Sequence, residues 1–298
     1  LLASFGIGNL SQMNSIAVNL NSAFSIPNWA TGIAFVILSA LVIVGGLKRI
    51  AAVTEKLVPG MVVLYIVGSL AICISNIDMF GAVFGSIFSN AFGIEAAAGG
   101  FAGIAMKEVV TQGCKRGVFS NEAGLGSSVM VHSCSNVKEP VKQGMWGIFE
   151  VFFDTMIVCT MTALVVLLGV GVQNIEYGTD IGANLTIMGF QSVFGGALPG
   201  VAVAICLSLF ALSTVLAWAL YGTRCIEYLF GHKAVRVYQV IFCLFACIAG
   251  AVKLDLAWAI ADTLNGLMAI PNLVGLAFLS PVVVKLTKEY FANVKANK

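Results

Sequence analysis

The sequence is poor in charged residues: Asp, Glu, Lys and Arg make up only 10% of its 298 residues, and it contains two histidines. A soluble globular domain normally has about 25% charged residues. Hydrophobic residues instead account for 59% of the chain, and its mean hydropathy is +0.97. This composition excludes an ordinary soluble protein, because water would not solvate so apolar a surface. It predicts that a lipid bilayer surrounds much of the chain.

Several functional motifs are also missing. The eight cysteines form no CxxC pair and no His/Cys cluster with metal-ligand spacing, and most lie in apolar runs as small hydrophobic residues. No nucleophile–base–orienter set and no Walker loop occurs, which argues against a membrane enzyme and against an ATP-driven pump. The net charge is only +2, without a basic block interleaved with aromatic residues, so nucleic acid is not an expected partner.

What the sequence does contain is a series of near-continuous apolar runs of about 17 to 25 residues, the length that an α-helix needs to cross a bilayer. A membrane β-barrel would show alternating residues over about ten positions instead. The runs predict an all-α integral membrane protein of about eight spans, folded as one domain over residues 1–298. The expected spans are residues 1–24, 29–46, 58–75, an irregular one within 101–135, 144–171, 200–221, 237–252 and 256–284. Residues 76–100 are a mixed region, and residues 172–199 are an expected loop.

Lysine and arginine residues alternate between the expected loops. Twelve of them lie in the loops after the second, fourth and sixth spans and in the C-terminal tail, whereas the opposite loops contain only Lys253. The lysine-rich side is cytoplasmic by the positive-inside rule. We therefore expect a multi-pass membrane protein. Because the chain begins at Leu1, inside an apolar run and without an initiator Met, we expect a fragment cut at its N-terminal side.

The span within residues 101–135 is unusual, because glycines, hydroxyls, an amide and a carboxylate crowd between Gly113 and Ser128. Glycine costs a helix interior about 1 kcal/mol relative to alanine. Non-helical backbone survives at membrane depth only where it is buried in protein or lines a polar cavity. An interrupted helix exposes N–H and C=O groups that suit a carboxylate and a Na⁺ ion, respectively. The alternative is an interfacial loop that joins two shorter helices.

Two carboxylates, Glu150 and Asp154, are four residues apart in a mostly apolar run, so they share one helix face. Carboxylates inside a membrane are expensive and usually face the interior of the bundle. They predict either a contribution to an ion or gating site, or structural partners for Lys115 or Arg116.

Hydroxyl and amide side chains mark two further helices. Ser213 and Thr214 offer oxygens to a hard cation, although a hydroxyl bonded back to the carbonyl one turn earlier is the favoured interpretation. Trp218 shares the face of Thr214 and either walls a small cavity or faces lipid. The first span contains five amides, which either bridge helices or, at Gln12, contact a substrate. These amides are Asn9, Gln12, Asn14, Asn19 and Asn21.

Residues 116–127, RGVFSNEAGLGS, resemble the signature of the alanine or glycine:cation symporter family. Residues 5–12, 150–155 and 210–214 are similar to that family as well, and the resemblance extends over the whole chain. It implies a LeuT-type fold of two five-helix inverted repeats, here without its first two repeat helices, in which the irregular span is the second broken helix. Because the first broken helix supplies much of the ligand coordination, we expect that the chain as given does not transport on its own.

The resemblance also implies a function, namely symport of a small neutral amino acid, alanine or glycine, with Na⁺ as the coupling ion, by alternating access. For an amino-acid importer, the cell membrane is the default location. It implies Ser213 and Thr214 as Na⁺ ligands, and a pocket closed by Phe119 and Trp218 that favours small substrates. The implied substrate-binding residues are Gln12, Phe119, Ser120, Asn121, Glu122, Gly124, Thr214 and Trp218.

Two other functions remain open. The first is a proton-coupled transporter of another small substrate, in which Glu122, Glu150 or Asp154 carries protons. The second is a channel or a membrane sensor that does not transport.

Overall fold

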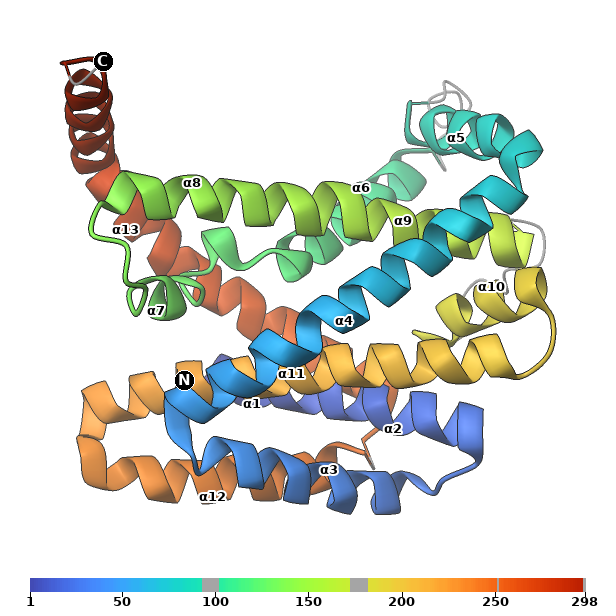
Figure 1. The fold of residues 1–298 in the computed structure, drawn as a ribbon, viewed down its shortest axis with the longest axis horizontal. Coiled ribbons are helices and arrows are strands. Elements are labelled where there is room, and N and C mark those ends of the chain that lie inside the picture. Colours follow the sequence, from blue (N-terminus) through green and yellow to red (C-terminus); the bar gives the residue numbers. More distant parts are fainter. Residues whose placement is uncertain (93–101, 172–181, 251, 297–298) are drawn as a thin grey trace.

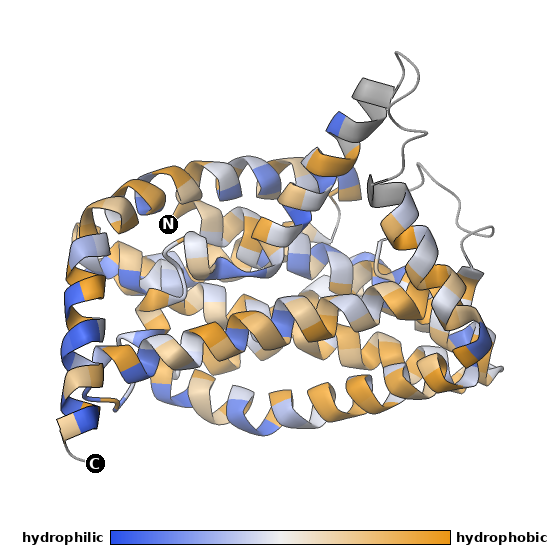
Figure 2. Ribbon diagram, turned by 90° about the horizontal axis from the view of Figure 1, so that it is seen from above, coloured by the Kyte–Doolittle hydropathy of each residue, from blue (hydrophilic) through white to orange (hydrophobic). Residues whose placement is uncertain are grey.

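The computed structural model describes residues 1–92, 102–171, 182–250 and 252–296, and this part of the chain is helical, without a β-strand. Most helices run along the long axis of the molecule, and α4 (Gly46–Ser75) crosses the others obliquely (Figure 1). Apolar residues cover most of the helices, and hydrophilic residues gather towards the C-terminal end (Figure 2). The all-helical prediction is therefore confirmed for the described residues.

The first helical segment is continuous and consists of α1 (Leu2–Phe5), the π-helix η1 (Gly6–Leu10) and α2 (Ser11–Phe24). A second continuous segment, Pro140–Gly171, consists of α8 (Pro140–Val151), the π-helix η4 (Phe152–Val158), α9 (Cys159–Leu164) and the π-helix η5 (Val165–Gly171). The other elements are α3 (Asn28–Ile43), α5 (Ile77–Phe92), α6 (Ala102–Ser120), the 3₁₀ turn η3 (Glu122–Gly124), α7 (Val129–His132), α10 (Asn184–Phe194), α11 (Leu198–Phe230), α12 (His232–Ala249) and α13 (Leu254–Ala296).

Five helices of the described residues are long and apolar enough to cross a membrane. They are Gly46–Ser75, Pro140–Gly171, Leu198–Phe230, His232–Ala249 and Leu254–Ala296. Four of them contain an expected span, and His232–Ala249 covers most of the span expected at residues 237–252. The other three expected spans differ for separate reasons. The first is helical but rich in amides, the second forms the 16-residue α3, and the irregular one is broken.

The helix boundaries differ from the sequence-based prediction because hydropathy marks the apolar part of a helix and not its ends. Helix α4 begins twelve residues before the expected start at residue 58, since Lys48, Arg49 and Lys56 are compatible with a helix. Helix α5 lies in the mixed region, and α10 lies in the segment that was expected to be a loop.

The core of the bundle is built around α11, which packs against α2, α3, α4, α10 and α12. Met13, Ile16, Val215 and Phe242 are fully buried in one apolar cluster between α2, α11 and α12. A second cluster joins α4, η5, α10 and α11. These two clusters fix α11 as the central support of the site described below.

Buried amides tie α2 and η1 to α12 and to the residues that follow it. The Asn9 amide donates a hydrogen bond to the Phe242 carbonyl (2.7 Å), and the Asn14 amide donates to the carbonyls of Ala249 (3.2 Å) and Val252 (2.6 Å). The prediction that amides of the first span bridge helices is confirmed for these two residues.

The connections that are flanked by most of the lysines and arginines lie together. The α3–α4, α7–α8 and α11–α12 connections are at the same end of the bundle as the C-terminus, whereas the α2–α3 and α10–α11 connections are at the opposite end (Figure 1). The alternation of charge along the sequence therefore corresponds to the two ends of the folded bundle.

Candidate functional site

The helix that was expected to be irregular is broken in the structure. Helix α6 ends at Ser120, the backbone is extended at Asn121 (φ −122°, ψ 124°), and η3 follows before α7 begins at Val129. The Asn121 side-chain oxygen accepts a hydrogen bond from the backbone N–H of Ala123 (2.8 Å) and so caps the turn. The interrupted helix is confirmed, but the break is shorter than the glycine-rich run, since Gly113 and Gly117 remain inside α6.

Helix α13 supports the break from one side. The Asn272 amide donates a hydrogen bond to the Gly124 carbonyl (3.0 Å). Gly126 has a φ of +81°, and a Cβ there would lie 2.6 Å from the Asn272 side-chain oxygen. The position therefore needs glycine for its left-handed backbone and for the close approach of Asn272.

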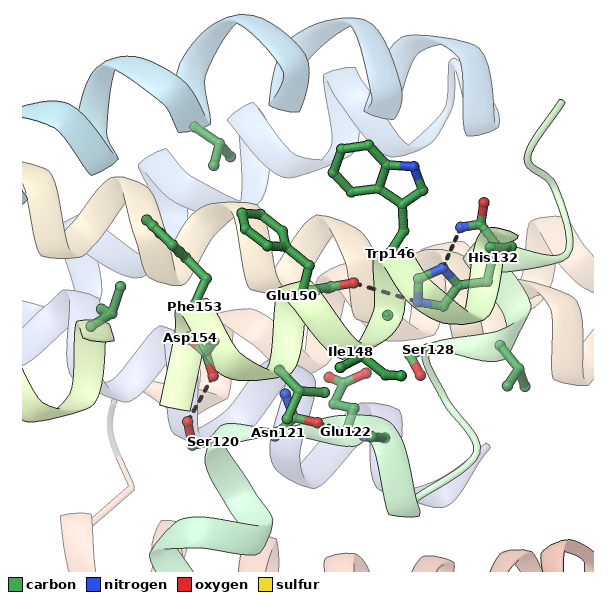
Figure 3. Close-up of a pocket in the computed structure, with 18 of the residues that line it drawn as sticks. Ser120, Asn121, Glu122, Ser128, His132, Trp146, Ile148, Glu150, Phe153 and Asp154 are labelled. Atoms are coloured by element: carbon green, nitrogen blue, oxygen red, sulfur yellow. Dashed lines mark hydrogen bonds and ion pairs between the residues drawn. The ribbon is translucent and has the colours of Figure 1, made fainter. Parts of the chain in front are cut away.

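A large cavity of about 1610 Å³ borders the break and is lined by residues of α4, α7, α8, η4 and α11. Ser120, Asn121 and Glu122 enter it from the break, and Glu150 and Asp154 face them from the opposite helix (Figure 3). The Ser120 hydroxyl donates a hydrogen bond to the Asp154 carboxylate (2.8 Å). Both carboxylates therefore line the cavity, and one of them contacts the break directly.

His132 connects α7 to α8 at the same cavity. Its Nε2 lies 3.5 Å from the Glu150 carboxylate, and its Nδ1 lies 2.7 Å from the Gln143 amide nitrogen (Figure 3). Sequence reasoning gave this histidine no role, because nothing in the sequence shows that residues 132 and 150 face each other.

The two basic residues before the break pair with α13. The Arg116 guanidinium donates to both oxygens of Asp262 (2.8 and 2.6 Å), and the Lys115 ammonium lies 3.9 Å from the same carboxylate. Arg116 also lies over the Trp258 ring, 4.2 Å from its centroid. The alternative in which Glu150 and Asp154 are their partners is therefore wrong. Asp262 has a recognisable signal, since it is a carboxylate inside the apolar run 256–284.

A smaller cavity of about 350 Å³ lies on the other side of Glu122, and Ser213, Thr214 and Trp218 line it. The Ser213 and Thr214 hydroxyls both donate to the Phe210 carbonyl (2.7 and 3.1 Å), so the favoured interpretation of these hydroxyls is confirmed. Trp218 is only 3% exposed, so the alternative in which it faces lipid is wrong.

The remaining predicted residues, Phe119, Gly124 and Gln12, line neither cavity. Phe119 packs against the cluster that contains Trp218, and its ring lies 4.9 Å from that of Trp258. Gly124 lies in the break and accepts the bond from α13. Gln12 lines neither cavity but lies one turn beyond Gly8, whose Cα faces Trp218. Its contact with a substrate stays a prediction.

Comparison with known proteins adds an independent observation. The family model described as the sodium:alanine symporter family matches residues 1–298. The chain is 44% identical over 297 residues to the sodium/alanine symporter AgcS of Methanococcus maripaludis, covering 99% of this chain and 64% of that protein. It is 38% identical over 297 residues to an uncharacterized transporter of Haemophilus influenzae, covering 100% of this chain and 64% of that protein. It is also 35% identical over 302 residues to the probable sodium/glutamine symporter GlnT of Bacillus subtilis, covering 99% of this chain and 60% of that protein. The chain thus spans less than two thirds of the length of these relatives.

Proposed function

Because the chain belongs to the sodium:alanine symporter family, we propose that it is part of a secondary active transporter that moves a small neutral amino acid together with Na⁺ across the cell membrane. The observation that carries this proposal is the broken helix at a large cavity, in a chain that the family model matches throughout. Five apolar helices of the described residues fit a multi-pass protein. The fold that we propose is of the LeuT type, working by alternating access.

The break supplies the chemistry that an amino acid needs. Its backbone after Asn121 is not paired as in an α-helix, so N–H groups at the turn suit a carboxylate and free carbonyls suit a cation. The Ser120 hydroxyl and the Asn121 amide add short polar groups at the cavity. We place the substrate here. In this proposal the backbone of Gly124 contacts the substrate, the side chains of Thr214 and Trp218 form one wall of its site, and Gln12 makes a further contact.

Alanine or glycine is the proposed substrate, for two reasons. AgcS, at 44% identity, is named a sodium/alanine symporter, whereas GlnT, at 35% identity, is named a probable sodium/glutamine symporter. The rings of Phe119 and Trp218 belong to one packed cluster. Neither ring lines the large cavity, and we propose that they close the other side of the substrate site against larger side chains.

The coupling ion that we propose is Na⁺, with Ser213 and Thr214 as ligands from α11. Coupling to protons is the second candidate, because Glu122, Glu150 and Asp154 all line the large cavity and each has an oxygen that can take a proton.

The test is uptake of radiolabelled alanine into proteoliposomes that contain the product of the complete coding sequence. We expect accumulation that needs an inward Na⁺ gradient and is lost in Asn121→Ala. Gly60 is exposed, and a Cβ added there would have no neighbouring atom within 4 Å. It gives the control variant Gly60→Ala, which should transport as the unmodified protein does. Uptake that ignores Na⁺ and follows a pH gradient would replace sodium with protons, and passive, non-saturable flux would exclude a symporter.

A further inference from the structure

Glu122 is the one predicted site residue that borders both cavities. It is the first residue of η3, and it lies between the large cavity on the side of α8 and the small cavity on the side of α11. Its position is fixed by Ser127, whose hydroxyl donates a hydrogen bond to the Glu122 carboxylate (2.7 Å). The side chains of Tyr221 and Trp218 face the same carboxylate. An indole N–H can only donate, so Trp218 can give a hydrogen bond to an oxygen of this carboxylate.

Among the residues that the structure describes, no lysine, arginine or histidine forms an ion pair with the Glu122 carboxylate. The nearby basic groups are already paired, since Lys115 and Arg116 contact Asp262 and His132 contacts Glu150. A second carboxylate, that of Glu150, lines the same large cavity. An ionised carboxylate without a partner inside a membrane bundle is costly, so a bound cation would stabilise the charged form of Glu122.

The smaller cavity offers the oxygen ligands that such a cation needs. The hydroxyl protons of Ser213 and Thr214 are used in bonds to the Phe210 carbonyl, and the Thr54 hydroxyl donates to the Ile50 carbonyl (2.9 Å). A hydroxyl that has given its proton away still has lone pairs. All three hydroxyls line the cavity with Glu122. Their oxygens can therefore coordinate a cation, whereas their protons are already used in hydrogen bonds within the helices.

The rest of the lining excludes competing ligands. Apart from Glu122, the three hydroxyl groups and the indole of Trp218, the cavity is walled by Leu, Ile, Val and Ala residues. Hard cations prefer oxygen ligands. The carboxylate on η3, one hydroxyl on α4 and two hydroxyls on α11 form such a set.

We propose that Glu122, Thr54, Ser213 and Thr214 form a binding site for the coupling Na⁺ ion in the smaller cavity, with Glu122 as its charged ligand. This inference rests on the proposed sodium coupling and adds to it the carboxylate and Thr54. Because Glu122 also borders the large cavity, an ion that neutralises it changes the electrostatics of the substrate site. Binding of ion and substrate is then coupled, and the coupling acts equally in both directions.

The test measures binding of radiolabelled Na⁺ without amino acid, in the purified product of the complete coding sequence, and alanine uptake in parallel. We expect Glu122→Gln to raise the Na⁺ concentration at half-saturation about tenfold or more. Thr54→Ala should raise it about threefold, and Thr54→Ser should restore it. The control is Glu289→Gln, which changes an exposed carboxylate beside Lys285. This variant should bind Na⁺ as the unmodified protein does.

The outcomes separate this inference from the proposed function. Unmodified protein that binds no Na⁺ and takes up alanine without it would overturn sodium coupling itself. Sodium-driven uptake together with normal Na⁺ binding in Glu122→Gln would overturn only the assignment of Glu122. An increase in the alanine KM alone would do the same, because the carboxylate would then bind the ammonium group of the substrate. If Glu122→Gln does not give a monodisperse protein, Thr54→Ala and Thr54→Ser decide, and equal Na⁺ affinity in both variants would exclude the site.

Discussion

Replacing Gly8 by alanine should damage the contact between η1 and α11. A Cβ at Gly8 would collide with the Cβ, Cγ and Cδ2 atoms of Trp218. A new rotamer of Trp218 cannot relieve this collision, because its Cβ moves only with the backbone. Trp218 is 3% exposed and packs with Ala3, Ile7 and Ala261, so η1 and α11 have to separate.

The expected cost follows from the size of that separation. Overpacking of a close-packed core by a methylene typically costs about 1 to 3 kcal/mol, and about 2 kcal/mol changes the ratio of folded to unfolded protein roughly 30-fold. Since Trp218 lines the smaller cavity and faces Glu122, the same displacement should lower the affinity for Na⁺ and alanine.

Thermal unfolding of the purified protein and alanine uptake measure the two effects. Gly60→Ala is the matched control, since it adds the same methyl group in the interior of α4 where no atom lies within 4 Å. We expect Gly8→Ala to unfold at a clearly lower temperature than Gly60→Ala and to transport less. Equal stability and equal uptake in the two variants would refute the close contact between η1 and Trp218.

Three further changes test other parts of the site. Asp262→Asn removes the ion pair with Arg116, both partners being partly exposed, and should cost about 1 kcal/mol in thermal unfolding; no change would show that the pair does not stabilise α6 against α13. Asn272→Ala removes the hydrogen bond to Gly124 and should lower alanine uptake severalfold while costing about 1 kcal/mol in stability. Normal uptake in that variant would mean that the break does not need α13. Trp218→Ala should widen substrate selectivity in competition assays with larger amino acids, and unchanged selectivity would count against Trp218 as a wall of the pocket.

The sequence predicted the broken helix because its polar and glycine residues are contiguous. Ser120, Asn121 and Glu122 follow one another, so their local chemistry was visible, and the structure places all three at the large cavity. The same holds for Glu150 and Asp154, because a spacing of four residues fixes a shared helix face. Patterns of this kind depend only on residues that are close in the sequence, either adjacent or one helical turn apart.

Contacts between helices could not be predicted in this way. Arg116 pairs with Asp262, 146 residues away, and Asn272 reaches Gly124 across 148 residues. Neither pairing has a local spacing that would reveal it. Thr54 was also missed, since a lone threonine near the lysine-rich start of a helix is indistinguishable from an ordinary surface residue until α4 is seen to cross beside α11.

The polar groups inside the bundle are held in two different ways, and this difference bears on how the site can move. Asn9 and Asn14 donate to carbonyls at and beyond α12, so they join whole helices. The break, by contrast, is held to α13 by the Asn272 bond, and its Glu122 carboxylate is held by the hydroxyl of Ser127, just before α7 begins. One of the bonds at the break ends on the Glu122 carboxylate, so an ion that neutralises Glu122 acts directly on the break, whereas no bond of Asn9 or Asn14 involves that carboxylate. Motion coupled to ion binding should therefore arise at the break between α6 and α7.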